Sequence, residues 1–517
     1  MTSGTVLTGS YFDSVALMAA AVQLRKLPGV QDVALVMATA TNKAILHSAG
    51  MLLPSFAGAK DEDLLVAVIA DNGDAAAAAL GAVDDALRGG GPSLPPDAPR
   101  TLHGGVAALP SASLALISVA GRFAADEALD ALRLGLHVMI FSDNVPLERE
   151  VELKHLARNR GLLLMGPDCG SAIINGAPLG FANVVRRGSV GIVAASGTGL
   201  QEVSTIVSNQ GAGISQALGT GGRDTLREVG GIMFLEALRL LTDDAATAVI
   251  VLIAKAPDTE VVPLISRAAR RSDKPVVTAF LGVSHDGPGP WAFSATTLEE
   301  AGIAAATLAK GDDVSAIPQI LAARRSEMKA IAASIRPSLA PSQRFVRGLF
   351  SGGTLRGEAA SIMMPLVGSF AGDLRRSASA ERASAPRGGM HSLVDLGADE
   401  FTVGRPHPMI DYSLRCRRLV QEARDPGVAV ILMDVVLGYG AHPDPAGELA
   451  PAIQDAQRIA SEGGRTLPIV VSVTGTAADP QRLPSVQDAL REAGAVVAPS
   501  NAAASYLAAT IAAGRDA

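Results

Sequence analysis

Short apolar runs that end in small or polar loops alternate with helical segments over most of the chain, and this alternation limits the possible folds. Between residues 187 and 310 the runs are SVGIVAA, GISQALG, AVIVLIA and PVVTAF. The same order returns between 341 and 517, with RFVRGLF, SLVDLG, VAVILMD and PIVVSV. Such runs are typical of parallel strands that helices cover on both faces. The sequence therefore predicts two copies of a flavodoxin-like α/β unit, 187–310 and 341–517.

Two further units are expected upstream. Residues 101–186 alternate strand and helix through LALISVAG, HVMIFSD and LLLMGPDCG, which is half of a Rossmann-like doubly wound sheet. Residues 1–90 predict a small α/β domain with strands at DVALVMA and LLVAVIA. The run GGGPSLPPDAPR (89–100) predicts a linker, and 311–340 a mostly helical connection. The polar segment 373–390 is expected to be a mobile surface loop. The fold class is multi-domain α/β.

Composition excludes several functional classes. The net charge is −7 and no long basic run occurs, which argues against nucleic acid as a ligand. Cys169 and Cys416 are the only cysteines and lack metal-ligand spacing, so we expect no metal site and a reducing, cytoplasmic environment. No apolar run approaches the roughly 18 residues of a membrane span. The expected partners are therefore proteins and small molecules, with no membrane.

Two turns follow the first strand of each flavodoxin-like copy. Their residues are Ser196, Gly197, Thr198 and Gly199 in the first copy, and Ser351, Gly352, Gly353 and Thr354 in the second. A strand that ends in small residues and opens a helix leaves backbone N–H groups and the positive helix end free to bind an anion. Packing alone would explain either turn, with Thr198 or Thr354 as N-cap. Equivalent turns in two repeats favour a pair of helix N-termini that binds one anion.

A third turn, GTGGRD, offers Gly221, Gly222 and Arg223 to a phosphate or carboxylate, because a guanidinium can bind two oxygens at once. A plain turn with an Arg–Asp pair is the alternative. The loop VGRPHPMID contains Arg405 and His407, which we take as candidate catalytic residues. Proline on either side of His407 stiffens the loop and favours a positioned side chain.

Other histidines and motifs carry less weight. His285 and His442 follow strands in loops, where histidine is usually solvated. The spacing Gly-x-Gly-x-x-Gly is absent from GTGGRD, which disfavours a nicotinamide enzyme.

Several motifs together resemble a known family. LLLMGPDCGSAI, GSVGIVAASGTGLQEV and ISQALGTGGRD resemble the α subunit of succinyl-CoA synthetase, while SLVDLGADEF, VAVILMDVVLGYG and LREAG resemble the carboxy-terminal domain of its β subunit. A single chain that joins both is the arrangement of the FdrA family. The stretches SYFDSV, ATNKAIL and TVGRPHPMID also resemble sequence motifs of that family. The resemblance covers nearly the whole chain. It implies that the two turns form a shared phosphate cradle and that residues 101–186 are of the CoA-binding type.

The sequence also departs from the synthetases. The N-terminal unit replaces the Gly-rich first half of the CoA-binding domain, which leaves CoA binding open. The region between VVTAF and LEEAG is short, and His285 is poorly placed there for a phosphohistidine. AKAPD, with Lys255, stands where the synthetases have a Gly-Glu-Ile-Gly-Gly loop. No ATP-grasp domain is present, so the chain alone should not be a nucleotide-driven ligase.

The FdrA resemblance implies a transferase subunit of allantoin and purine nitrogen catabolism. The implied oxamate carbamoyltransferase reaction converts oxalurate and phosphate to oxamate and carbamoyl phosphate, with two partner subunits and no required cofactor. Helix ends, with Arg223 or Arg405, would stabilise charge on the transferring carbamoyl group. A homo-oligomer is also expected. The alternatives are an acyl-CoA synthetase-like or acyl-CoA transferase-like enzyme and a non-catalytic scaffold subunit.

Overall fold

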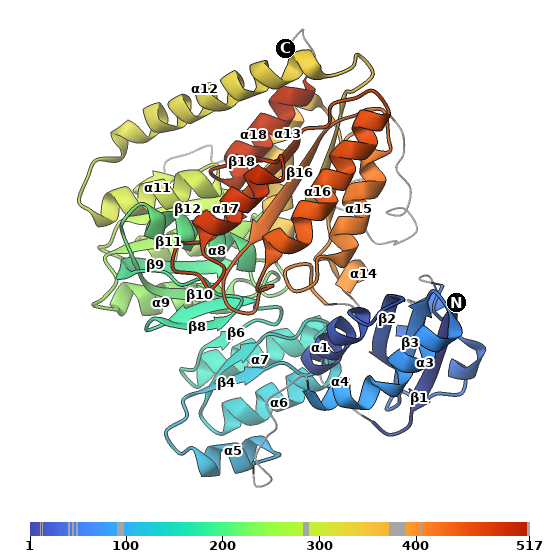
Figure 1. The fold of residues 1–517 in the computed structure, drawn as a ribbon. Helices are drawn as coiled ribbons and strands as arrows, with labels where there is room; N and C mark the ends of the chain where they lie inside the picture. Colours follow the sequence, from blue (N-terminus) through green and yellow to red (C-terminus); the bar gives the residue numbers. More distant parts are fainter. Residues whose placement is uncertain are drawn as a thin grey trace.

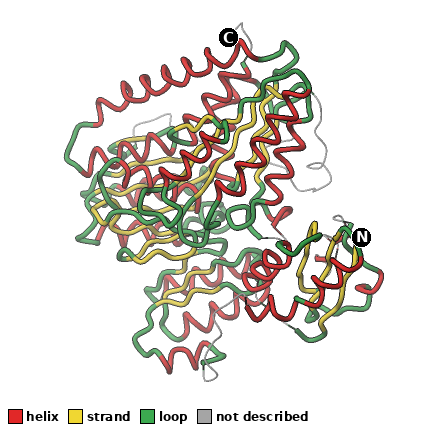
Figure 2. Tube along the Cα trace, in the orientation of Figure 1, coloured by secondary structure: helices red, strands yellow, loops and turns green. Residues whose placement is uncertain are grey.

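The computed structural model describes residues 1–10, 12, 14–39, 42–43, 46–47, 50–89, 98–282, 289–371, 389–402 and 406–513. Four sheets follow one another along the chain, each with helices packed against it (Figures 1 and 2). The surface loop expected at 373–390 falls almost entirely outside the described residues, and so does most of the expected linker. His285 and Arg405 also lie outside them.

The N-terminal unit is a three-stranded antiparallel sheet in the order β1-β3-β2. Its elements are β1 Thr2–Leu7, α1 Ser14–Arg25, β2 Val30–Met37, η1 Pro54–Phe56, β3 Leu64–Ala70, α3 Gly73–Gly81 and α4 Val83–Gly89. Side chains alternate along β3, so Leu64 and Val66 enter one apolar cluster while Leu65 and Ala67 enter another on the opposite face. The central strand is therefore buried on both faces, as its unbroken apolar sequence predicts.

The next unit is a three-stranded parallel sheet in the order β4-β5-β6. Its elements are α5 Leu102–Ala108, β4 Leu114–Ile117, α6 Gly121–Arg133, β5 His137–Ile140, α7 Leu147–Asn159 and β6 Leu164–Met165. Helix α6 buries Ala124, Ala128 and Ala131, which lie one helical turn apart on one stripe. The topology is the strand–helix alternation of half a Rossmann-like sheet.

A seven-stranded sheet follows, in the order β13-β12-β11-β9-β10-β7-β8. Its strands are β7 Ser171–Ile174, β8 Ala177–Gly180, β9 Arg187–Ala195, β10 Ile214–Gly219, β11 Val249–Lys255, β12 Val276–Leu281 and β13 Phe293–Ser294. Its helices are α8 Gly197–Asn209, α9 Ile232–Asp243, α10 Val262–Ala269 and α11 Leu298–Ala309. The five parallel strands from β9 onward have the flavodoxin order 2-1-3-4-5.

The β7–β8 hairpin pairs with β10, so it belongs to this larger sheet although the sequence places it within the unit 101–186. Asn175 and Gly176 form its two-residue turn at positive φ, 52° and 84°. That geometry matches the right-handed twist of the flanking strands, and Asn-Gly is the dipeptide that adopts it most readily.

The last sheet has the order β15-β14-β16-β17-β18, again 2-1-3-4-5. Its strands are β14 Phe345–Phe350, β15 Ser392–Asp395, β16 Val428–Val436, β17 Ile469–Thr474 and β18 Val496–Ala498. Its helices are α13 Gly353–Val367, α14 Asp399–Thr402, α15 Ser413–Ala423, α16 Pro445–Glu462, α17 Leu483–Glu492 and α18 Asn501–Ala512.

The two flavodoxin-like units pack against each other reciprocally. Helix α8 of the first contacts β17 of the second, and α13 of the second contacts β12 of the first. One apolar cluster contains buried side chains of both units, among them Val203, Leu355 and Leu507. Helix α12, Ile317–Ile335, connects the units and packs along α18 (Figure 1). The units therefore share one core and a local twofold relationship.

Candidate active site

The first strands of the two flavodoxin-like units end opposite each other. Ser196 is the N-cap of α8, and Gly352 is the N-cap of α13. The Ser196 hydroxyl donates to Thr354 Oγ1 across the interface at 2.7 Å. In the reciprocal contact, a β-carbon on Gly352 would lie 2.5 Å from Thr198 Cγ2. Each N-cap thus touches the second residue of the opposite helix, and glycine at 352 allows this approach.

These contacts correct two details expected from the sequence. Neither threonine is an N-cap, because Ser196 caps α8 by accepting the Gly199 N–H at 2.9 Å. Ser351 is an additional residue before the Gly352 cap, and its side chain is engaged. The Ser351 N–H donates to Asp434 Oδ1 at 2.8 Å, and its hydroxyl donates to the other Asp434 oxygen. Ser351 therefore anchors the turn.

Four backbone N–H groups remain at the paired helix ends. Among the described residues, no acceptor binds the N–H of Gly197, Thr198, Gly353 or Thr354. First-turn N–H groups of a helix have no partner within that helix, and the helix dipole makes this end positive. Two such ends in contact form a site that suits a small anion.

Lys255 and Asp395 flank this site. Each is the last residue of a strand next to the first strand of its unit, β11 beside β9 and β15 beside β14. A β-carbon on Gly353 would lie 2.8 Å from Asp395 Oδ2 and 3.2 Å from Lys255 Nζ. Any other residue at Gly353 would therefore place atoms between these charged groups and the helix end.

The Asp395 carboxyl titrates close to neutral pH. Burial raises its pKa to about 6, although a hydrogen bond from the Gly397 N–H and the charge of Lys255 lower it. A carboxyl with such a pKa can exchange a proton with a bound substrate near pH 7. Asp395 was not among the site residues predicted from the sequence. The available signal was an acidic residue that ends a strand at the carboxyl edge of the sheet.

His407 reaches the same area. A β-carbon on Gly397 would lie 2.8 Å from His407 Nε2, 3.3 Å from Asp395 Oδ1 and 2.6 Å from the Ser351 carbonyl oxygen. His407 Nδ1 accepts the Met409 N–H at 3.3 Å, so Nε2 carries the proton in the neutral ring. Burial, with a smaller effect of Arg415, lowers the pKa of His407 to about 4. His407 is therefore a neutral hydrogen-bond donor at pH 7.

The third predicted turn has a different setting. A β-carbon on Gly221, where φ is 89°, would lie 2.4 Å from the Pro167 carbonyl oxygen, and Gly222 faces the neighbouring Asp168. The Arg223 guanidinium lies 2.8 Å from Glu150 Oε2 and donates to the Val145 carbonyl. This turn joins the Rossmann-like unit to the seven-stranded sheet, and Arg223 is engaged there and not at the paired helix ends.

The acidic partner in this turn also differs from the expected Arg–Asp pair. Asp224 binds the buried Lys154 at 2.8 Å. The same Lys154 ammonium lies 2.8 Å from Glu150, so both carboxylates have a buried cation as partner. This buried network lies at the junction of the two units.

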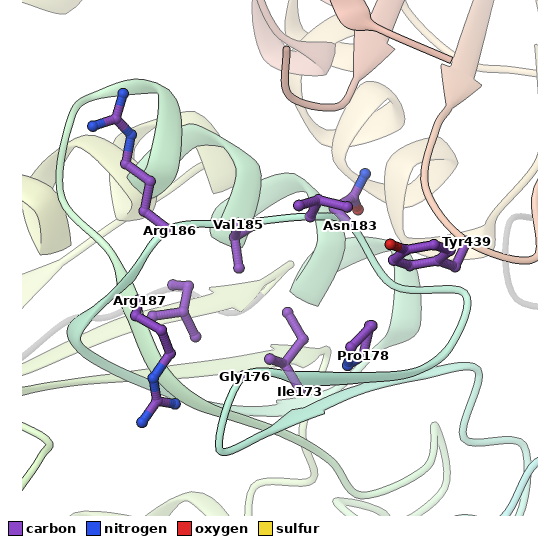
Figure 3. A pocket seen from close by; sticks show the side chains of 10 residues that line it. Ile173, Gly176, Pro178, Asn183, Val185, Arg186, Arg187 and Tyr439 are labelled. Atoms are coloured by element: carbon purple, nitrogen blue, oxygen red, sulfur yellow. The ribbon is translucent and has the colours of Figure 1, made fainter. Parts of the chain in front are cut away.

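A small cavity of about 130 Å³ lies elsewhere (Figure 3). It is bordered by the β7–β8 hairpin, by residues 183–187 and by Tyr439 of the last unit. The side chains of Arg186 and Arg187 extend away from it (Figure 3). Arg187 and Ile214 begin β9 and β10, so the cavity is at the amino edge of the parallel strands. Ligands of such sheets bind at the carboxyl edge, where the paired helix ends lie.

The other features considered in the sequence add no further residue to this site. His442 Nδ1 accepts the Asp444 N–H at 3.1 Å, at the start of α16. Within the described ranges, no three His, Cys, Asp or Glu side chains are grouped to hold a metal ion. No helix in these ranges is long and apolar enough to cross a bilayer.

Two flavodoxin-like sheets with opposed helix N-termini define a CoA-ligase-type α/β protein, and comparisons agree. Residues 349–511 match the family model described as CoA-ligase. Residues 1–94 match a second model, described as the heavy metal-associated domain of AllF. This stretch contains no cysteine.

Relatives extend the match to the whole chain. YahF of Escherichia coli (strain K12) is 40% identical over 501 residues, 95% of each chain. The chain therefore belongs to the YahF family, as an FdrA/AllF-type, succinyl-CoA synthetase-like protein. The α subunit 2 of an Archaeoglobus fulgidus succinate–CoA ligase is 30% identical over 38% of this chain and 67% of its own length. A dinucleotide-forming acetyl-coenzyme A synthetase from Ca. Korarchaeum cryptofilum, solved with phosphate and ADP, covers 78% of this chain and 82% of its own, with 17% identity and a TM-score of 0.29.

Proposed function

We propose that this protein is an acyl-CoA ligase-like enzyme that transfers an acyl group between CoA and phosphate. The phosphate would bind to the N–H groups of Gly197, Thr198, Gly353 and Thr354. The observation that carries the proposal is the reciprocal contact of the two helix N-termini, which brings the first-turn N–H donors of both helices to one interface. Preorganised donors of this kind stabilise charge that develops on a transferring group.

The neighbouring side chains support the same chemistry. A phosphate oxygen would attack the acyl carbon, the bond from that carbon to the CoA sulfur would break, and the thiolate would take up a proton. Asp395, with its pKa raised to about 6, is suited to accept the proton of the attacking phosphate. Lys255, near the start of α13, would offset phosphate charge. The protonated Nε2 of His407 would orient an oxygen of the acyl group.

Carbamoyl transfer from oxalurate to phosphate is the second candidate, because the chain is of the FdrA/AllF type. Carbamoyl phosphate is an acyl phosphate in its bonding, so the same cradle would serve. The attacked atom would be the carbamoyl carbon, and oxamate would leave with a proton in place of CoA. This reaction needs phosphate as co-substrate and no cofactor. Two partner subunits and self-association belong to this proposal.

The test compares the two donors with the same protein. The full chain, alone and with any co-purifying subunits, is given phosphate with either succinyl-CoA or oxalurate. Thiol release with acyl phosphate formation supports the first reaction, and carbamoyl phosphate formation supports the second. If neither donor gives product, with folded protein and partners present, both proposed reactions are contradicted. The remaining alternative is then a non-catalytic scaffold subunit.

A pair of glycine variants locates the reaction. Gly353→Ala places a methyl group 2.8 Å from Asp395 Oδ2, inside the cradle, and should reduce phosphate affinity and product formation. Gly357→Ala is the matched control on the same helix, because its β-carbon would meet only Lys255 Cδ at 3.7 Å. Equal phosphate affinity in the two variants would contradict phosphate binding at the start of α13.

A further inference from the structure

Ion pairs connect the N-terminal unit to the rest of the protein. Its two apolar clusters contain only residues of the unit itself, numbered below 90. In the described chain, the ion pairs that leave it are Arg25–Asp411, Asp32–Arg417 and Asp61–Arg122. The unit therefore has its own core, and these ion pairs link it to the rest of the protein.

Arg25 makes the most enclosed of these contacts. It is the last residue of α1, and its own unit fixes the guanidinium, with Nε 3.2 Å from Asp32 Oδ1 and Nη2 donating to the Val33 carbonyl at 3.2 Å. Nη1 of the same group binds the Asp411 carboxylate and donates to Ser413 Oγ at 3.3 Å. The Arg25 and Asp411 side chains are only 14% and 12% exposed.

Asp411 closes the turn that carries His407. The Ile410 and Asp411 N–H groups both donate to the His407 carbonyl, at 2.7 and 3.1 Å. The Asp411 carboxylate in turn accepts the Ser413 N–H at 2.8 Å, where α15 begins. Fixing Asp411 therefore fixes the backbone on which the His407 ring is mounted.

A second path leads from the same contact to the start of α13. Helix α15 carries Arg415, which donates to the Asp434 carbonyl and lies 3.5 Å from Asp434 Oδ1. Asp434 holds the N–H and the hydroxyl of Ser351, immediately before the Gly352 cap. Arg25 therefore contacts the start of α15 at Ser413. Arg415 of the same helix binds Asp434, which in turn holds the turn before α13.

We propose that Arg25 is a positioning residue for the active site. The docked N-terminal unit holds the His407 turn and the start of α15 through the Arg25–Asp411 contact, and the site is complete only while this contact is made. The inference rests on the proposed function in treating His407 and the α13 end as parts of one site. It assigns the N-terminal unit a role in the geometry of a site more than 300 residues away in sequence.

The experiment uses the full chain with Arg25→Ala and measures three quantities. These are amide hydrogen exchange in the segment 406–413, the NMR signal of the His407 ring, and the affinity for inorganic phosphate. Loss of a hydrogen-bonded charge pair should speed exchange in this segment about tenfold and weaken phosphate binding about tenfold. The His407 signal should shift because its ring environment is no longer fixed.

Three further variants make the result specific. Arg122→Ala removes another ion pair of the same unit, with Asp61 at 3.4 Å, and should leave all three quantities unchanged. Arg25→Lys retains the charge and should restore part of the loss. Asp411→Asn keeps the oxygen that accepts the Ser413 N–H and removes the charge. It should therefore change the three quantities in the same way as Arg25→Ala, and it provides the test if the Arg25→Ala protein folds poorly.

The outcomes separate this inference from the proposed function. Arg25→Ala and Asp411→Asn proteins with normal exchange in 406–413 and an unshifted His407 signal would overturn the positioning role. Faster exchange with normal phosphate affinity would overturn it as well. If the unmodified protein binds no phosphate, the cradle function fails, and the His407 signal of the variants still decides whether Arg25 positions that ring.

Discussion

Asp395 and His407 face the same glycine, Gly397, yet burial acts on their protonation in opposite senses. Burial disfavours the charged form of each group, so it raises the pKa of Asp395 to about 6 and lowers the pKa of His407 to about 4. At pH 7 the carboxyl is mostly ionised and the imidazole is neutral. The two side chains therefore offer a proton acceptor, Asp395, and a neutral hydrogen-bond donor, His407, within one site.

This assignment predicts the pH dependence of catalysis. If ionised Asp395 accepts the phosphate proton, the rate of product formation should rise as the pH passes upward through about 6. Asp395→Asn should lower kcat by roughly 100-fold or more and abolish this rise. Rates from pH 5 to 8 with saturating phosphate measure both effects. A variant that keeps the rise near pH 6 would assign the proton transfer to another group.

Single residues were the least predictable level from sequence. The small residues of the two turns could be recognised because a strand that opens into a helix has a local signature. Asp395 could not be distinguished from other acidic residues, because its importance arises from the packing of β15 against α13. Arg223 had the right chemistry for an anion, but folding supplies Glu150 as its partner.

At the scale of elements, each helix that forms the cradle also caps the last helix of the opposite unit. Glu202 of α8 accepts the N–H of Asn501, the first residue of α18, at 3.0 Å. Glu358 of α13 accepts the N–H of Leu298, the first residue of α11, at 2.6 Å. A carboxyl oxygen at a helix N-terminus accepts an N–H that has no partner within the helix, whether or not the group is ionised. These reciprocal caps fix α8 and α13 against each other.

The second cap predicts a pH dependence of stability. Burial raises the pKa of Glu358 from 4.5 to about 8, so the folded protein keeps a proton that the unfolded chain has lost. Its contribution to stability is therefore fully present below about pH 4.5 and is lost as the pH rises toward 8. Urea unfolding at several pH values should show this fall, and Glu358→Gln should reduce it by roughly 1 to 3 kcal/mol.

The control for this measurement is Glu152→Gln, which removes an exposed carboxylate of α7 and should leave the slope unchanged. Burial also raises the pKa of Glu202 and Glu299, so some dependence on pH should remain in Glu358→Gln. If the free energy of unfolding of Glu358→Gln depends on pH as steeply as that of the unmodified protein, Glu358 is ionised in the folded protein at neutral pH.

Elements with a repeated pattern were predicted well, and irregular ones were not. The buried strands β9, β11, β14 and β16 follow from mostly apolar runs, although Arg347 interrupts β14 and Asp434 interrupts β16. Strand β1, TSGTVL, has too few large apolar side chains to be distinguished from a loop. The β7–β8 hairpin had a local signal in Asn-Gly, but its pairing with β10 depends on contacts about 40 residues apart in sequence.

At the scale of the whole molecule, the two flavodoxin-like units share an apolar core that the N-terminal unit does not enter. The flavodoxin-like units contribute side chains to the same apolar cluster, whereas the N-terminal unit keeps its clusters to itself. Units that share a core lose packing together when one of them opens. The two flavodoxin-like units should therefore behave as one cooperative body.

Two cavity-forming substitutions test this division. Leu355→Ala in α13 removes a fully buried side chain of the shared core and should cost about 2 to 5 kcal/mol. Hydrogen exchange should rise together in α8, α13 and α18. Val66→Ala, in the core of the N-terminal unit, should raise exchange in β1 and β2 and leave α8 and α18 protected. Exchange confined to α13 in the first variant would contradict a shared cooperative core.

The connection through α12 has a consequence for how the cradle assembles. Because one polypeptide supplies both helix ends, their encounter is intramolecular and proceeds at an effective concentration that the linker sets. Dilution cannot separate these two helix ends, however scarce the protein is. A chain divided at this helix would instead depend on the concentration of each fragment, and half-sites would accumulate when either was limiting.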